Sequence, residues 1–311
     1  MLPLAVSLLL VPLTASQLLS PFRIPPWKAK NDPNWGPTFV QPEQVHIAIW
    51  DNHTISVTWI SFDDVLDAIV EWGKGRTLDR VAKGSITLFV AEGVHRYVSR
   101  VHLYLDKDTP GDIFRYRVGS AHGWSPIYEF RYLKPRDDGG YEIIMYGDMG
   151  NENARSMGMI QKLAQNGDID LIHHVGDYGY DLDTDSGRVG DEYFRQIESA
   201  AAYVPYMPTV GNHESAENFT HYTNRFTAPG GQPLFYSYDL DKVHFISFTT
   251  EVYYFTDYGW DQIQTQYNWL VDDLKKANAN RKNVPWIVTL GHRPMYCSDA
   301  DGDDCTKFES V

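Results

Sequence analysis

Residues 169–180 of the chain read IDLIHHVGDYGY, and this stretch decides the class of fold. Residues 169–175 are a mainly apolar run with the length and composition of a buried strand. The run ends at Gly176, and a carboxylate, Asp177, and a phenol, Tyr180, follow closely. Functional residues of layered α/β proteins lie in loops beyond the carboxyl ends of strands. The stretch therefore predicts such a strand with a functional loop at its end.

Three further strand-like runs end in the same way. The first run, at residues 142–146, is followed by Gly147-Asp148-Met149-Gly150. The second, at residues 204–210, is followed by Gly211-Asn212-His213-Glu214, and the third, at residues 286–290, is followed by Gly291-His292. Each motif alone is typical of an ordinary turn or, for a lone histidine, of a satisfied core residue. Together they favour one metal site, because carboxylates and a phenolate suit a hard trivalent ion, whereas an amide oxygen and imidazole suit divalent zinc, manganese or iron.

The same half of the chain alternates strands with helices. Residues 154–164 suit a helix, residues 245–249 a strand, and Ile263, Tyr267, Leu270 and Leu274 line one face of a second helix. This alternation predicts a layered α/β domain over residues 141–311. His173 and His174 lie inside the strand at residues 169–175, so we expect structural roles for both.

Residues 41–133 follow a different pattern, with short alternating runs separated by turn residues. This pattern predicts a β-sandwich of the immunoglobulin or fibronectin III kind, with Trp59 as a core residue. The expected strands cover residues 45–50, 54–60, 68–72, 85–90, 97–105, 114–118 and 127–132. Residues 134–140 read as a linker. The predicted class is therefore β + α/β, with the sandwich preceding the layered domain.

The composition limits the partners and the compartment. The 311 residues carry a formal charge of −14 and scattered basic residues, which argues against a nucleic-acid partner. Residues 1–16 resemble a signal peptide, with a buried N-terminal strand as the alternative, and no other run is long and apolar enough to cross a membrane. We therefore expect a secreted protein, in the extracellular space or an endomembrane lumen.

Two further features fit a secretory route. The triplets that begin at Asn52 and Asn218 match the glycosylation sequon. Cys297 and Cys305 could close a small loop in an oxidising compartment, although the sequence alone does not show that they pair.

The strand-end motifs resemble those of the metallophosphoesterases and, among these, the purple acid phosphatases. The family blocks Gly-Asp-x-Gly, Gly-Asp-x-x-Tyr and Gly-Asn-His-Glu match in full, and the block at residues 289–292 has Thr where the family often has Val. Most members of the wider metallophosphoesterase superfamily have His in place of Gly150 and Asp in place of Tyr180. The exchange at both positions marks the purple branch, which has an Fe(III)-tyrosinate. The resemblance begins near Gln41, is strongest to the animal iron/zinc form, and implies a fibronectin-like domain before the catalytic domain.

The resemblance also implies a ligand set. Asp148, Asp177 and Tyr180 would bind Fe(III), and Asp177 would bridge to a second ion, Zn(II) or Fe(II). Asn212 and His292 would hold that second ion. Two cations lower the pKa of bound water, so hydroxide would be available as the nucleophile at acidic pH.

The implied reaction is hydrolysis of a phosphate monoester to an alcohol and inorganic phosphate. His213 would hold the phosphoryl oxygens or protonate the leaving alcohol. Glu214 would orient His213.

One family block is absent from the sequence. The Gly-His-x-His motif, which supplies one histidine to each ion, does not occur, and Val311 lies nineteen positions after His292 (311 − 292). This departure implies a C-terminally incomplete catalytic domain. The alternative function is then a catalytically silent secreted glycoprotein or fragment. A neutral metallophosphodiesterase is a further alternative, against which Gly150 and Tyr180 argue.

Overall fold

The computed structural model describes residues 37–294. The predicted signal peptide and both cysteines lie outside this range, so they stay predictions. The sandwich and the α/β layer described below belong to one compact unit, which begins at Thr38.

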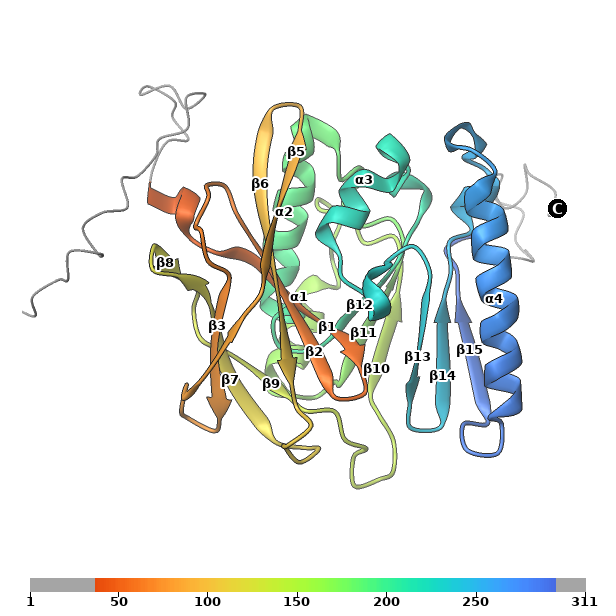
Figure 1. Cartoon of the computed structure of the whole chain (residues 1–311), viewed down its shortest axis with the longest axis horizontal. Helices are drawn as coiled ribbons and strands as arrows, with labels where there is room; N and C mark the ends of the chain where they lie inside the picture. The colour runs from red at the N-terminus through yellow and green to blue at the C-terminus, as the bar shows by residue number, and fades with distance from the viewer. Residues whose placement is uncertain (1–36, 295–311) are drawn as a thin grey trace, which may run out of the picture. The chain divides into compact units, whose positions relative to one another are not determined.

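The first part of the described chain folds into two antiparallel sheets (Figure 1). One sheet has the strand order β1-β2-β6-β5, and the other has β4-β3-β7-β8, with β9 also paired to β7. The strands are β1 (Glu43–Asp51), β2 (Thr54–Ser61), β3 (Ile69–Lys74), β4 (Arg80–Lys83), β5 (Ser85–Ala91), β6 (Val94–Tyr104), β7 (Ile113–Ser120), β8 (Gly123–Trp124) and β9 (Tyr128–Arg131). A short helical turn, η2 (Pro37–Val40), precedes them. The predicted sandwich is confirmed, and β4 and β8 are additional strands.

The core of the sandwich is built from the alternating inward residues of both sheets. Val57 and Trp59 come from one sheet, and Trp72, Phe114 and Phe130 come from the other. Trp59 is buried, as its alternating position predicts. Burying these side chains removes a large apolar area from water, which is the main force that holds the two sheets together.

The second part is an α/β layer with two short sheets. Strands β10, β11 and β12 form a parallel sheet, while β13 pairs antiparallel with β14 and β14 pairs parallel with β15. The elements are β10 (Ile143–Tyr146), α1 (Met157–Asn166), β11 (Leu171–Val175), α2 (Thr184–Ala201), β12 (Tyr206–Thr209), η3 (Asn212–Glu214), α3 (Ala216–Arg225), η4 (Pro229–Gly231), β13 (Tyr236–Leu240), β14 (Val243–Ser247), η5 (Glu251–Tyr253), η6 (Thr256–Tyr258), α4 (Asp261–Ala279) and β15 (Trp286–Leu290). The layered domain is confirmed, although β13, α2 and α3 are additional elements and the strand expected at residues 245–249 lies two residues earlier.

The register of the parallel strands places their carboxyl ends at one edge. Tyr146 of β10 lies beside His174 of β11, and Val175 lies beside Thr209 of β12. The side chain of Thr209 contacts that of Ser247 in β14, with 2.8 Å between the hydroxyl oxygens, and Ser247 pairs with Leu290 at the end of β15. The four predicted loops therefore all leave the sheets at the same edge.

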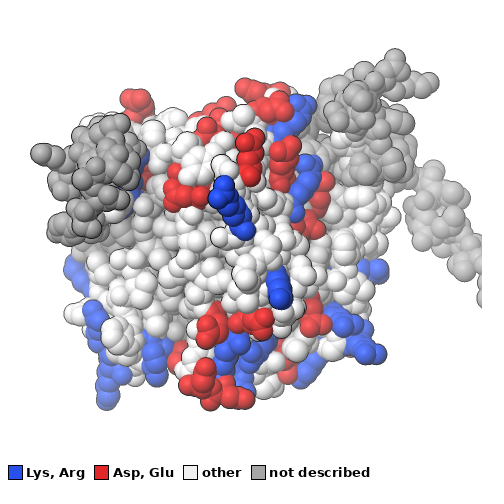
Figure 2. All heavy atoms as spheres, turned by 180° about the vertical axis from the view of Figure 1, so that it is seen from behind, with Lys and Arg blue, Asp and Glu red and all other residues white. Residues whose placement is uncertain are grey.

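The molecular surface carries both signs of charge. Figure 2 shows one face, on which acidic side chains dominate the upper margin and acidic and basic side chains alternate along the lower margin. Among the described residues, no helix has the length and apolar character needed to cross a membrane.

A buried ionic cluster joins the sandwich to the α/β layer. Asp191 of α2 accepts hydrogen bonds from Arg96 of β6 at 2.7 Å and from Arg225 of α3 at 2.8 Å. The side chains of both arginines are completely buried. Burial alone would raise the pKa of Asp191, but the charges of Arg225 and Arg96 hold this pKa below its usual value. Asp191 therefore stays ionised in mildly acidic solution, and the joint between the two layers is retained there.

Replacing Asp191 tests this joint. We expect Asp191→Asn to lower the free energy of unfolding by about 3–5 kcal/mol at neutral pH, because two buried guanidinium groups would lose their anion. The folded-state pKa is depressed, so this stabilisation is present above the unfolded-state pKa and is lost as pH falls through the folded-state value. Urea unfolding measures the change, with Asp67→Asn as the control, because the Asp67–Lys83 pair is exposed. A loss for Asp191→Asn no larger than that of the control would contradict the account.

Candidate metal centre

Three of the predicted ligands converge at the shared edge of the sheets. Asp148 follows β10, Asp177 follows β11 and His292 follows β15, and each offers one ligand atom within 4.8 Å of the others. Asp177 is buried, His292 is half-buried and Asp148 is exposed. The convergence arises because the parallel strands align these loops, although the residues are far apart in sequence.

The other two predicted ligands belong to the same cluster. The Tyr180 hydroxyl donates a hydrogen bond to Oδ1 of Asp148 at 3.1 Å. The Asn212 amide oxygen lies 3.1 Å from Nε2 of His292. Nδ1 of His292 faces the Val175 carbonyl at 2.9 Å, so Nε2 points into the cluster and lies 3.4 Å from Asp177. All five residues predicted to bind metal therefore form one connected group.

The electrostatics of this group fit a cation. Burial alone would lower the pKa of His292, but the hydrogen bond and charge of Asp177 raise it to about 9. Burial also raises the pKa of Tyr180, and the charges of Asp148 and Asp177 raise it further. The negative charge of Asp148 and Asp177 contributes to both raised pKa values, and this charge would also attract a metal cation. Its donors, two carboxylates, a phenol, an amide oxygen and an imidazole, suit a hard ion beside a borderline divalent ion.

The backbone of the ligand loops is held in an uncommon conformation. Asp148, Asp177 and Tyr180 have φ angles of 57°, 57° and 47°, in the left-handed region. Such residues cost on the order of 1–3 kcal/mol each and cluster at functional sites. The neighbouring loops also approach closely, since a Cβ on Gly176 would lie 2.5 Å from Nδ1 of His292, and one on Gly211 would lie 2.7 Å from the Asp177 nitrogen. Glycine at these two positions lets the loops meet.

Glu214 fastens two of the loops together. Its buried carboxylate accepts hydrogen bonds from the backbone N–H groups of Asp177 at 2.9 Å, Tyr178 at 3.0 Å and Gly211 at 3.0 Å. Burial and the charge of Asp177 raise the pKa of Glu214 to about 7, while the three N–H groups act in the opposite direction. The expected contact between Glu214 and the His213 side chain is replaced by these backbone contacts.

The side chain of His213 has a different partner. Its Nδ1 contacts Oδ1 of Asp181, and its ring lies against the Tyr180 ring with 4.3 Å between centroids. The His213 N–H donates to Asp177 at 3.1 Å, which seats the residue beside the candidate ligands. Asp181 was not predicted from the sequence, because no spacing rule links it to His213. The only feature of the sequence that pointed to Asp181 was its position directly after Tyr180.

His173 and His174 have the structural surroundings expected of strand residues. Both are fully buried, and their imidazoles contact the hydroxyls of Tyr238 at 2.7 Å and Tyr206 at 2.5 Å. Burial lowers the pKa of His173 to about 3, so its ring is neutral.

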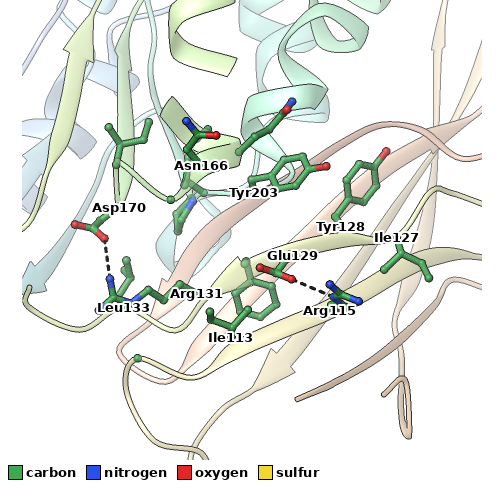
Figure 3. Close-up of a pocket in the computed structure, with 18 residues that line it drawn as sticks. Ile113, Arg115, Ile127, Tyr128, Glu129, Arg131, Leu133, Asn166, Asp170 and Tyr203 are labelled. Atoms are coloured by element: carbon green, nitrogen blue, oxygen red, sulfur yellow. Dashed lines mark hydrogen bonds and ion pairs between the residues drawn. The ribbon is translucent and has the colours of Figure 1, made fainter. Parts of the chain in front are cut away.

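A cavity of about 860 Å³ lies away from this cluster (Figure 3). It is bordered by β9 of the sandwich, by Asp170 just before β11, and by Val204 and Pro205 just before β12. The candidate ligands follow the opposite ends of these parallel strands. The cavity is therefore separate from the candidate metal centre.

Two family descriptions match the chain. Residues 141–310 match the calcineurin-like phosphoesterases, and residues 42–132 match the N-terminal domain of the purple acid phosphatases. Among curated proteins, acid phosphatase type 7 of Danio rerio is 45% identical over 88% of this chain, and the Homo sapiens protein of the same name is 43% identical over 86%. The alignments cover 63% and 62% of those proteins, so the chain spans less than two thirds of their length.

A solved structure shares the fold. The purple acid phosphatase PPD1 from yellow lupin (Lupinus luteus) seeds aligns with a TM-score of 0.64 at 23% identity, over 83% of this chain and 52% of the lupin chain. The family match to residues 141–310 covers more than half of the sequence and includes all five candidate ligands. The chain therefore belongs to the calcineurin-like phosphoesterase family, and it carries the N-terminal domain of the purple acid phosphatases.

Proposed function

We propose that the protein is an acid phosphatase that hydrolyses phosphate monoesters at a dinuclear Fe(III)–Zn(II) or Fe(III)–Fe(II) centre. The observation that carries this proposal is the convergence of Asp148, Asp177 and His292, with Tyr180 and Asn212 attached to the same group. The similarity to acid phosphatase type 7 supports the same reaction class.

The ligand roles follow from the donor chemistry. Asp148, Asp177 and Tyr180 would hold Fe(III), while Asn212 and His292 would hold the divalent ion together with Asp177. The bound ions supply positive charge that attracts the phosphate and lowers the pKa of water. Glu214 acts as a positioning residue, because it keeps the loop of Asp177 against the loop of Asn212.

His213 is the proposed proton donor. In hydrolysis, a water oxygen forms a bond to phosphorus and releases a proton to the solvent, while the bond from phosphorus to the ester oxygen breaks. The departing alkoxide needs a proton, and His213 lies beside the candidate ligands with Nδ1 held by Asp181. That contact turns Nε2 toward the candidate ligands, 3.8 Å from Oδ2 of Asp177, where it would hold a phosphoryl oxygen or protonate the leaving group.

We also propose that the protein follows the secretory route. Asn52 lies in the exposed turn between β1 and β2, and Asn218 is exposed in α3, so both predicted acceptor sites are accessible. A mass decrease after enzymatic removal of N-linked glycans from protein made in a secretory host would support this route.

Substitution of Tyr180 tests the metal assignment. The wild-type chain loaded with iron and zinc should be coloured, because a phenolate bound to Fe(III) absorbs visible light by charge transfer. Tyr180→Phe should lose this absorption, and Tyr104→Phe, which removes an exposed hydroxyl of the sandwich, should keep it. Visible spectra at matched iron content measure the difference. An unchanged spectrum in Tyr180→Phe would refute the assignment.

Substitution of His213 tests the catalytic assignment. We expect His213→Ala to lower kcat on a monoester by about 10²-fold or more, the usual contribution of a positioned proton donor. Iron and zinc content and colour should stay unchanged, because His213 is not among the proposed ligands. His95→Ala on the sandwich is the control. Full activity in His213→Ala would remove this residue from the mechanism, whereas loss of metal would reassign it as a ligand.

A further inference from the structure

A second cavity lies between α3 and the start of α4. Its volume is about 470 Å³, within the range of small-molecule sites, and the loop before β13 forms its third side. Figure 1 shows α3 and the start of α4 at the same end of the sheets. The exposed side chain of Asn218, the acceptor of one of the two predicted sequons, belongs to the lining. A predicted glycan attachment site therefore opens directly onto a cavity.

The lining of this cavity suits a neutral ligand that is rich in hydroxyl groups. Asp261 is the only charged side chain among the described residues that line it, so no basic group is present there to attract an anion. Asparagine, glutamine and threonine side chains supply amide and hydroxyl groups, and an apolar wall is formed by Leu234, Phe235 and Val252. A pyranose sugar offers the same two surfaces, hydroxyl groups around its edge and C–H groups on its faces. The lining therefore fits a sugar better than an ion or a purely apolar molecule.

One contact orients the Asn218 amide for attachment of a sugar. Gln262 of α4 donates a hydrogen bond from Nε2 to the amide oxygen of Asn218 at 2.7 Å. The amide nitrogen, which is the atom that carries the glycan in a sequon, makes no hydrogen bond to any other described residue. Glycosylation replaces one hydrogen of this nitrogen and leaves the oxygen able to accept. The contact with Gln262 is therefore compatible with an attached sugar.

The same glutamine carries a buried acceptor without a donor. Oε1 of Gln262 is buried and has no hydrogen-bond partner within the described part of the chain. A buried polar atom without a partner is destabilising, and such atoms are few in native proteins. The N–H and O–H groups of an N-acetylhexosamine would supply the missing donor. Gln262 would then contact both Asn218 and the sugar attached to it.

We propose that Asn218 carries an N-linked glycan whose first sugar, an N-acetylhexosamine, binds in the cavity between α3 and α4. This inference rests on the proposed secretory route and is independent of the phosphatase reaction. In the attachment step, Nδ2 of Asn218 bonds to the anomeric carbon of the sugar, the bond from that carbon to a lipid diphosphate donor breaks, and Nδ2 releases one proton. The covalent link gives the sugar a high effective concentration at the cavity, so weak contacts suffice to hold it.

Release of the glycan from folded protein tests this binding site. Peptide N-glycosidase converts each glycosylated asparagine to aspartate, so peptide masses report release at Asn218 and Asn52 separately in protein made by a secretory host. Gln262→Leu should speed release at Asn218 roughly three- to tenfold, the range of one hydrogen bond, relative to release at Asn52 in the same molecule. Gln264→Leu is the matched control, because Gln264 is exposed on the same helix and contacts Asn268 instead, and it should leave both rates unchanged.

Hydrogen exchange provides a second measurement that does not depend on Gln262. Thr220→Ala removes the sequon, whereas Thr220→Ser keeps both the sequon and the hydroxyl. Without the sugar, the backbone amides of residues 261–266 at the start of α4 should exchange roughly three- to tenfold faster, because a contact that joins α4 to α3 is lost. The Thr220→Ser protein should exchange like the wild type.

The outcomes separate the two proposals. Selective acceleration at Asn218 in Gln262→Leu, with faster exchange in Thr220→Ala, supports the inference. A glycan at Asn52 alone, or release at Asn218 that Gln262→Leu leaves unchanged, overturns the inference while the secretory route stands. If neither asparagine carries a glycan, both proposals fail. If Gln262→Leu speeds release at both sites equally, that variant has lost its fold, and unchanged exchange in Thr220→Ala would then overturn the inference.

Discussion

The buried carboxylate of Glu214 is the interaction on which the candidate site depends. It binds three backbone N–H groups from two loops, and these loops carry Asp177 and Asn212. Hydrogen bonds to a charged acceptor are stronger than neutral ones, and with the pKa of Glu214 raised to about 7 this acceptor is charged at and above neutral pH. The two loops are therefore held together before any ion binds. Such preorganisation lowers the cost of assembling a metal centre from distant parts of the chain.

The sheets and the sandwich hold these loops in position. The aligned ends of β10, β11 and β12 bring three loops to one edge, and β15 adds His292 through its pairing with β14. The sandwich contributes no candidate ligand. Its buried contact with α2 and α3 through Arg96 fixes the helix that follows the His213 loop. The depressed pKa of Asp191 keeps this contact intact in the acidic conditions in which the proposed reaction would occur.

The sequence predicted the elements whose patterns are local. The strand at residues 286–290 was predicted with the bounds of β15, and the candidate ligands were proposed because each follows a glycine in a loop after a strand. Helix α2 was missed because Gly187 and Gly190 interrupt its pattern, and residues 185–187 have left-handed backbone angles. The role of Glu214 and the contact of Asp181 could not be predicted, since both depend on how separate loops fold against each other.

The metal content of the purified full chain tests the central claim most directly. After loading with iron and zinc and removal of unbound ions, elemental analysis should find iron and a divalent metal in the wild-type protein. Asp177→Ala should lose most of both metals, because Asp177 is the proposed bridge between them, while Asp67→Ala should retain them. A wild-type chain that folds but retains neither metal would contradict the account.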